Sequence, residues 1–65
     1  MSPLTLRIRE LREKQGWSQA ELGRRAGVAA SVVNRIERRG TIALATLEKL
    51  ARALGVPPRS LLKGP

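Results

Sequence analysis

The sequence predicts an all-α fold built from five short helices, and two observations lead to this prediction. Glycine and proline divide the chain into short intervals, at Gly16, Gly27, Gly40, Gly55 and the pair Pro57 and Pro58. Within each interval the apolar residues recur every three or four positions, which is the period of a helix and not the alternation of a strand. Because 65 residues bury only one small core, we expect residues 1–65 to form a single domain.

The first helix is expected from about Pro3 to Gln15, with Gly16 ending it. Ser2 can cap its N-terminus, and proline suits the first helical position because the amide hydrogen it lacks would have no helical partner there. The apolar stripe of this helix consists of Leu4, Ile8 and Leu11.

The second helix is expected to start after Ser18 and to run to Ala26. Ser18 has Glu21 three residues later, which is the spacing of a capping box. Gly27 follows as the C-terminal stop.

Three further helices are expected at Ala29–Arg38, Leu44–Leu54 and Pro58–Lys63. The fourth has the clearest apolar periodicity and is closed by Gly55. Its apolar residues are Leu44, Leu47, Leu50, Ala51 and Leu54.

Residues 18–38 fit the template of a helix-turn-helix. Two short helices that cross at a steep angle need a small residue where their backbones approach, here Gly23, and a turn residue that tolerates positive φ, here Gly27. They also need apolar residues that hold the second helix on the first, and these are Leu22, Ala26, Val28, Val33 and Ile36. This spacing predicts that the segment between Gln19 and Arg38 reads DNA.

A helical wheel divides the third helix into two faces. The packed face consists of Ala29, Val33, Ile36 and Glu37, and the exposed face of Ser31, Asn34, Arg35 and Arg38. A short, polar and basic face of this kind suits entry into the major groove of DNA, where it reaches base edges and flanking phosphates. An ordinary solvated helix face is the alternative.

Glu37 is unusual because its carboxylate points toward packed surface, where an unpaired charge is costly. Arg12, on the same side of the first helix as Ile8, is the candidate partner. The alternative is a solvated Glu37 that pairs with Arg38 or with nothing.

The charge balance favours an anionic partner. Thirteen Lys and Arg stand against five Asp and Glu, for a net charge of +8, and ten of the thirteen are Arg. The planar guanidinium suits phosphate and guanine edges better than the ammonium of Lys does. We therefore expect double-stranded DNA as the partner, with solubility alone as the alternative.

The residue inventory argues against several other classes. The chain has no Cys and no His, no paired carboxylates and no Gly-rich phosphate loop, so we expect no enzyme, no catalytic residue, no metal and no cofactor. No signal-peptide pattern and no apolar run long enough to span a bilayer is present. The basic residues are spread over separate helices, unlike those of a membrane-surface helix. We expect a cytoplasmic protein without a membrane partner.

From Ile8 to Leu62 the sequence resembles the Cro and phage-repressor family of helix-turn-helix domains. The matching segments are IRELR (8–12), WSQAEL (17–22), GV (27–28), RIE (35–37) and LEKLARALGV (47–56). The resemblance implies a five-helix repressor-like fold that binds operator DNA, usually as a dimer.

The same resemblance implies residue roles. Residues matching Ala30, Ser31 and Arg35 face bases in this family, and Arg12 and Glu37 match a structural salt bridge. The expected phosphate contacts are Ser18, Gln19, Asn34, Arg38, Arg39 and Thr41. Gln19 also suits this role on physical grounds, because free amides at a helix N-terminus attract phosphate.

Several residues depart from the family pattern. Ala29 stands where a Ser or Thr usually caps the third helix, and Ala30 replaces a longer side chain, so the start of this helix has lost polar reach. Ile42 and Ala43 replace the Pro-Ser that commonly opens the fourth helix, which leaves Thr41 as its expected cap. These losses narrow the expected base readers to Ser31 and Arg35.

Two apolar features have more than one interpretation. Trp17 is expected as a core wedge just before the second helix, with stacking on a base as the alternative. The apolar C-terminal residues within 54–62 either close the core or include a homodimer contact.

The leading functional hypothesis is a sequence-specific transcriptional regulator that binds a pseudo-palindromic operator through residues 29–38. The alternative is a protein-interaction or antitoxin-type adaptor domain that keeps the fold while DNA binding is secondary, which the Ala29 and Ala30 losses would suit.

Overall fold

The computed structural model describes residues 3–62, which form five α-helices and no strand. The helices are α1 Pro3–Lys14, α2 Gln19–Ala26, α3 Ala30–Arg39, α4 Leu44–Leu54 and α5 Pro58–Leu62. The predicted all-α fold is confirmed. The expected cap Ser2, the side chain of Leu4 and the expected helix end at Lys63 lie outside the part that the structure describes.

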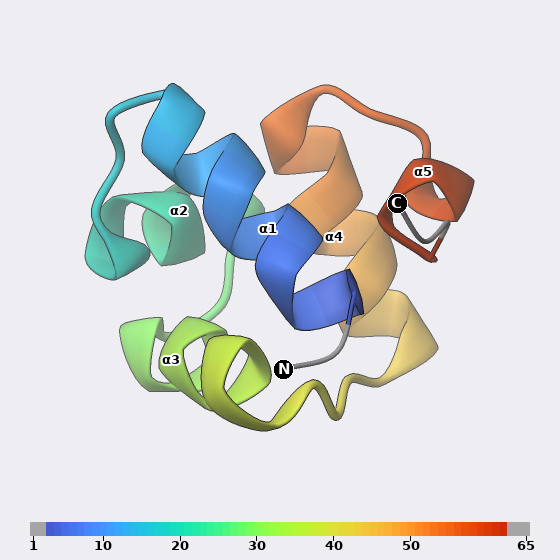
Figure 1. Ribbon diagram of the computed structural model, residues 1–65. Helices are drawn as coiled ribbons and strands as arrows, with labels where there is room; N and C mark the ends of the chain where they lie inside the picture. The colour runs from blue at the N-terminus through green and yellow to red at the C-terminus, as the bar shows by residue number, and fades with distance from the viewer. Residues whose placement is uncertain (1–2, 63–65) are drawn as a thin grey trace.

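The helices pack in a closed arrangement around one core (Figure 1). Helix α2 contacts both α3 and α4, α1 contacts α3 and α5, and α5 also contacts α4. In the view of Figure 1, α3 lies at the edge of the molecule below α1. One long side of α3 is therefore left uncovered.

The core draws apolar side chains from all five helices. Its fully or almost fully buried members are Ile8, Leu22, Val33, Ile36, Leu47, Leu50, Ala51, Leu54 and Leu61. Burying a side chain such as Val33 or Ile36 stabilises a fold by about 1.5–3 kcal/mol relative to leaving it exposed. These two residues fix the rotation of α3 about its own axis, which decides which residues face outward.

The α2–α3 turn is formed as expected around Gly23 and Gly27. A Cβ added to Gly23 would lie 2.5 Å from the backbone oxygen of Val28, so the helices approach closely only because this residue has no side chain. Gly27 adopts a φ of 78° and donates its N–H to the Gly23 carbonyl, which ends α2. The turn then delivers the chain directly into α3.

Helix α3 is displaced by one residue from the expected 29–38. Ala29 is extended and lies at the N-cap, without a side-chain hydrogen bond. Arg39 still belongs to the helix, because the left-handed residue that ends it is Gly40, with φ 77° and an N–H bond to the Ile36 carbonyl of 2.7 Å.

Thr41 does not cap α4, so that expectation is wrong. The N-cap is Ala43, and no side chain caps this helix. Thr41 precedes the N-cap by two residues, too early for its hydroxyl to take the place of a cap side chain on the first free amides.

Among the helices of residues 3–62, none is long and apolar enough to cross a membrane.

Candidate nucleic-acid interface

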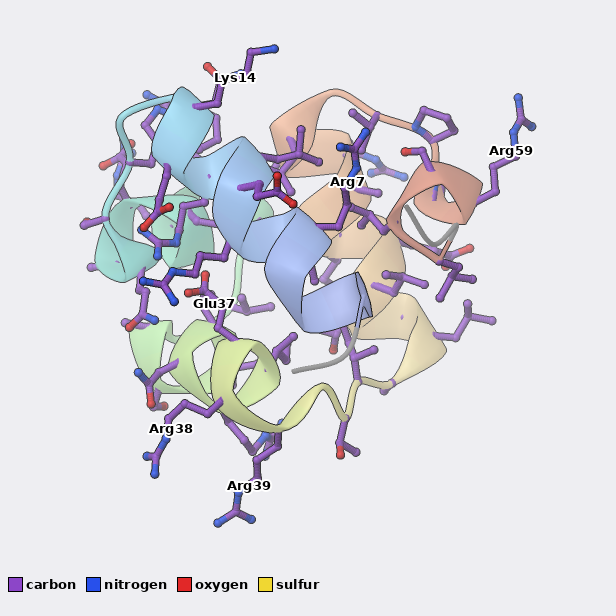
Figure 2. The ribbon with its side chains drawn as sticks, in the orientation of Figure 1. Arg7, Lys14, Glu37, Arg38, Arg39 and Arg59 are labelled. Carbon is purple, nitrogen blue, oxygen red and sulfur yellow. The ribbon has the colours of Figure 1, made fainter. Side chains whose placement is uncertain are left out.

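Three of the four side chains expected on the outer face of α3 are exposed, whereas Asn34 is partly buried. Val33, Ile36 and Glu37 are buried, while Ser31, Arg35 and Arg38 are exposed. Figure 2 shows Glu37 directed into the molecule and Arg38 and Arg39 extending away from it.

The helical wheel was wrong for Ala29, which is exposed. The wheel assumes a helical backbone, whereas Ala29 is the extended residue before α3. Ala30 is also exposed, so a methyl-bearing, weakly polar surface precedes Ser31 at the start of the face.

The exposed arginines of α3 have no carboxylate partner among the described side chains. Within residues 7–62, whose side chains the structure describes, Arg35, Arg38 and Arg39 form no salt bridge. By contrast, Glu21 pairs with both Arg24 and Arg25 on α2. Three positive charges without a local counter-ion therefore lie within five residues of α3, where an external anion can neutralise them.

Arg12 and Glu37 form a two-pronged ion pair between α1 and α3. Nε of Arg12 donates to Oε2 of Glu37 at 2.7 Å and Nη2 donates to Oε1 at 3.0 Å. The two side chains are only 11% and 5% exposed. The hydrogen bond with Glu37 raises the pKa of Arg12 above its ordinary value, although burial opposes the shift. Glu37 thus pairs with Arg12 and not with Arg38.

The third guanidinium nitrogen of Arg12 extends this contact to the loop before α2. Its Nη1 donates to the backbone oxygen of Trp17 at 2.8 Å. One guanidinium of α1 is therefore hydrogen-bonded both to the α1–α2 loop and to α3. These bonds fix the position of α3 relative to the start of α2.

Gln19 and Asn34 are joined to each other and to the ion pair. Nε2 of Gln19 donates to Oε1 of Glu37 at 3.1 Å, and Nδ2 of Asn34 donates to Oε1 of Gln19 at 3.1 Å. Sequence reasoning treated Gln19 and Asn34 as two separate phosphate contacts and missed this link. No local signal indicates it, because the two amides meet only through the crossing of α2 and α3.

Ser18 caps α2, but only half of the expected capping box is formed. Its Oγ accepts from the Glu21 backbone amide at 3.0 Å. The Glu21 side chain instead accepts from Arg24 and Arg25. Mainly through the Arg24 hydrogen bond, the pKa of Glu21 is lowered below its ordinary value. The Glu21 carboxylate therefore pairs with two guanidinium groups and not with the backbone amide of Ser18.

Trp17 is a partly buried wedge against the core, as the sequence led us to expect. The guanidinium carbon of Arg25 lies 4.3 Å from the centre of its ring. One ring face is thus covered by Arg25, which disfavours the alternative of stacking on a base.

The remaining candidates lie at the start of α2, along α3 and just after it. Ser18 and Gln19 stand at the start of α2, where Gln19 is bonded to Asn34 of α3, whereas Arg38 and Arg39 end α3 and are followed by the exposed Thr41. Ala30 and Ser31 form the start of α3, and Arg35 directly follows Asn34. The expected base readers and the expected phosphate contacts therefore alternate along α3, and Arg38 and Arg39 come last.

The C-terminal apolar residues divide into two groups. Leu54 and Leu61 are buried in the core, and Val56 packs against it. Leu62, by contrast, is 60% exposed. The core-closing interpretation holds for the first three residues and leaves Leu62 available to a partner.

Known proteins support the same interpretation of the fold. The family described as helix-turn-helix matches residues 8–61. The Neisseria hypothetical transcription factor of Neisseria meningitidis is 44% identical over 63 residues, covering 95% of this chain and 59% of that protein. The chain spans between 35% and 59% of the lengths of three curated relatives.

Two solved structures were determined with DNA. The P22 c2 repressor bound to a synthetic operator is 35% identical, with a TM-score of 0.88 over 100% of both chains. SinR of Bacillus subtilis in complex with DNA is 35% identical, with a TM-score of 0.85 over 92% of this chain and 98% of that one. By profile, sequence and structure, this chain belongs to the helix-turn-helix family, in the group that includes Cro and the phage repressors.

Proposed function

We propose that this chain is a sequence-specific DNA-binding transcriptional regulator that inserts α3 into the major groove. The observation that carries the proposal is the outer face of α3, where Arg35 and Arg38 are exposed without salt bridges to the described residues. The buried side of the same helix is fixed by Val33, Ile36 and the Glu37 ion pair. A rigid helix with a basic outer face is the arrangement that major-groove recognition requires.

In this proposal the base contacts come from Ala30, Ser31 and Arg35. Arg35 has the reach and the two-pronged geometry to bind the O6 and N7 atoms of guanine. Ser31 offers one hydroxyl, and Ala30 offers only a methyl group for contact with a thymine methyl. Arg35 therefore carries most of the sequence discrimination.

The phosphate contacts position the helix on the duplex. They are assigned to Ser18 and Gln19 at the start of α2, to Asn34 within α3, and to Arg38, Arg39 and Thr41 at and after the C-terminal end of α3. The P22 c2 repressor and SinR, whose structures include DNA, support this placement by their similarity over nearly the whole chain.

Binding as a homodimer is part of the proposal. The exposed Leu62 at the end of α5, within the segment 54–62, provides an apolar contact for a second copy. Two copies related by a twofold axis would bind a pseudo-palindrome whose half-site centres are about 34 Å apart. In this proposal the regulator binds its DNA in the cytoplasm and catalyses no reaction.

Selection from a pool of random duplexes tests this function. We expect enrichment of a short site that contains guanine in each half-site and is approximately palindromic. Retention of duplexes without any enriched sequence would contradict sequence-specific reading. Failure to retain duplexes at low salt would favour the protein-interaction alternative.

A further inference from the structure

We propose that Glu37 is a positioning residue that turns the amides of Gln19 and Asn34 so that both present N–H donors to one DNA backbone phosphate. The inference depends on the proposed DNA binding. Its basis is a chain of hydrogen bonds that runs from Arg12 through Glu37 and Gln19 to Asn34.

The direction of this chain is set at its buried end. An ionised carboxylate only accepts hydrogen bonds, and both oxygens of Glu37 already accept from Arg12. Gln19 must therefore turn its amide nitrogen, and not its oxygen, toward Glu37, where Nε2 lies 3.1 Å from Oε1. The Gln19 oxygen is left to face Asn34 and accepts from its Nδ2 at 3.1 Å.

Two donors remain once these bonds are formed. Each amide nitrogen carries two hydrogens, and the chain uses one from Gln19 and one from Asn34. Both residues are only partly buried, and in this proposal their second hydrogens face the solvent where α2 meets α3. A phosphate oxygen accepts these N–H groups, whereas a reversed amide would present its own carbonyl oxygen and repel it.

Charge counting and the positioning role predict opposite effects of neutralising Glu37 on the affinity for DNA. Removing an acid from a DNA-binding surface raises the positive charge and should strengthen binding. In this structure, however, the charge of Glu37 is already paired with Arg12. What Glu37 adds is the orientation of the two amides, so its neutralisation should weaken binding. Charge counting therefore predicts a gain in affinity, whereas the positioning role predicts a loss.

The first test compares E37Q with the parent chain on a 20-base-pair duplex of mixed sequence, by fluorescence anisotropy at low salt. A glutamine at this position can accept or donate, so Gln19 is free to reverse. We expect about tenfold weaker binding, equivalent to about one lost hydrogen bond to a charged group. E48Q is the matched control, because it removes an exposed glutamate of α4 and should bind as well as the parent or better. Equal or tighter binding by folded E37Q would overturn the inference.

E37Q leaves Arg12 buried without its counter-ion and can unfold the domain. The double variant R12M/E37M avoids this problem, because apolar residues of similar volume replace a buried ion pair with little loss of stability. It also leaves the net charge unchanged. With circular dichroism showing a folded chain, we expect the same roughly tenfold weakening, since no acceptor holds Gln19. Binding at the parent's affinity would contradict the inference.

A double-mutant cycle separates positioning from a purely structural role. In a Q19A background there is no amide left at position 19 to orient, so adding E37Q should cause little further loss of affinity. An equal loss in both backgrounds would show that Glu37 acts only through the fold. A parent chain that binds no duplex would contradict the proposed function itself, and this inference with it.

Discussion

Arg12 and Glu37, which are 25 residues apart in sequence, form two parallel hydrogen bonds between α1 and α3 in a site almost closed to solvent. Because a buried charge without its partner is costly, R12M should lower the free energy of unfolding by about 3 kcal/mol. In a domain of this size the melting temperature should fall by more than about 10 °C.

The matched control for this prediction is R9M. Arg9 also pairs with a glutamate, Glu13, but both side chains are about half exposed. An exposed pair contributes at most about 1 kcal/mol, so R9M should melt within a few degrees of the parent. Equal melting temperatures for R12M and R9M would show that the buried pair has no special role.

The close approach of α2 and α3 at Gly23 predicts an effect whose sign is informative. In a helix with free space, Gly→Ala stabilises by about 1 kcal/mol. Here the added Cβ would lie 2.5 Å from the Val28 backbone oxygen, so the turn must shift. We expect G23A to destabilise the domain by about 1–3 kcal/mol in urea unfolding. A more stable G23A variant would contradict the contact.

The ion pairs of Glu21 predict a dependence on pH. Hydrogen bonds from Arg24 and Arg25 lower the pKa of Glu21 in the folded state, so the ionised form stabilises the fold above the pKa of the unfolded chain. This contribution is lost as the pH falls through the lowered folded value. E21Q should therefore melt below the parent at neutral pH, and the difference should disappear in strong acid. A difference that is independent of pH would contradict this account.

Phosphate binding by residues of α2, α3 and the loop after α3 predicts a steep dependence on salt. With about six phosphates contacted, the logarithm of affinity should fall against the logarithm of salt concentration with a slope near −5. R38A and R39A should each reduce the slope by about one. A slope near zero for the parent would contradict phosphate binding.

The five helices could be predicted from the sequence because Gly and Pro separate them and their apolar periods are regular. The α2–α3 turn was also predictable, since Gly23 and Gly27 stand at the two positions where the backbone tolerates little else. The ends of α3 were less so. With alanine at the cap, the side chain gives no signal for the first residue, and the left-handed Gly40 extends the helix to Arg39.

The candidate site was predictable as a face but not as a network. Local spacing indicates which residues of α3 point outward and that Glu37 needs a cation. The bond from Gln19 to Asn34 depends instead on the crossing of two helices, and the choice of Glu21 between its backbone partner and two arginines depends on rotamers. Such contacts depend on how the helices pack against one another, and no short segment of sequence determines that packing.

The most direct test of the central claim measures the affinity of the parent, R35A and R59A for a duplex selected from the random pool and for its scrambled counterpart. Arg59 is an exposed arginine of α5 and provides the same change of charge away from α3. We predict that R35A loses at least about tenfold in preference for the selected duplex, since a two-pronged arginine contact to guanine discriminates by about 1–3 kcal/mol. R59A should keep the preference. If R35A distinguished the two duplexes as well as the parent does, α3 would not be the helix that reads DNA.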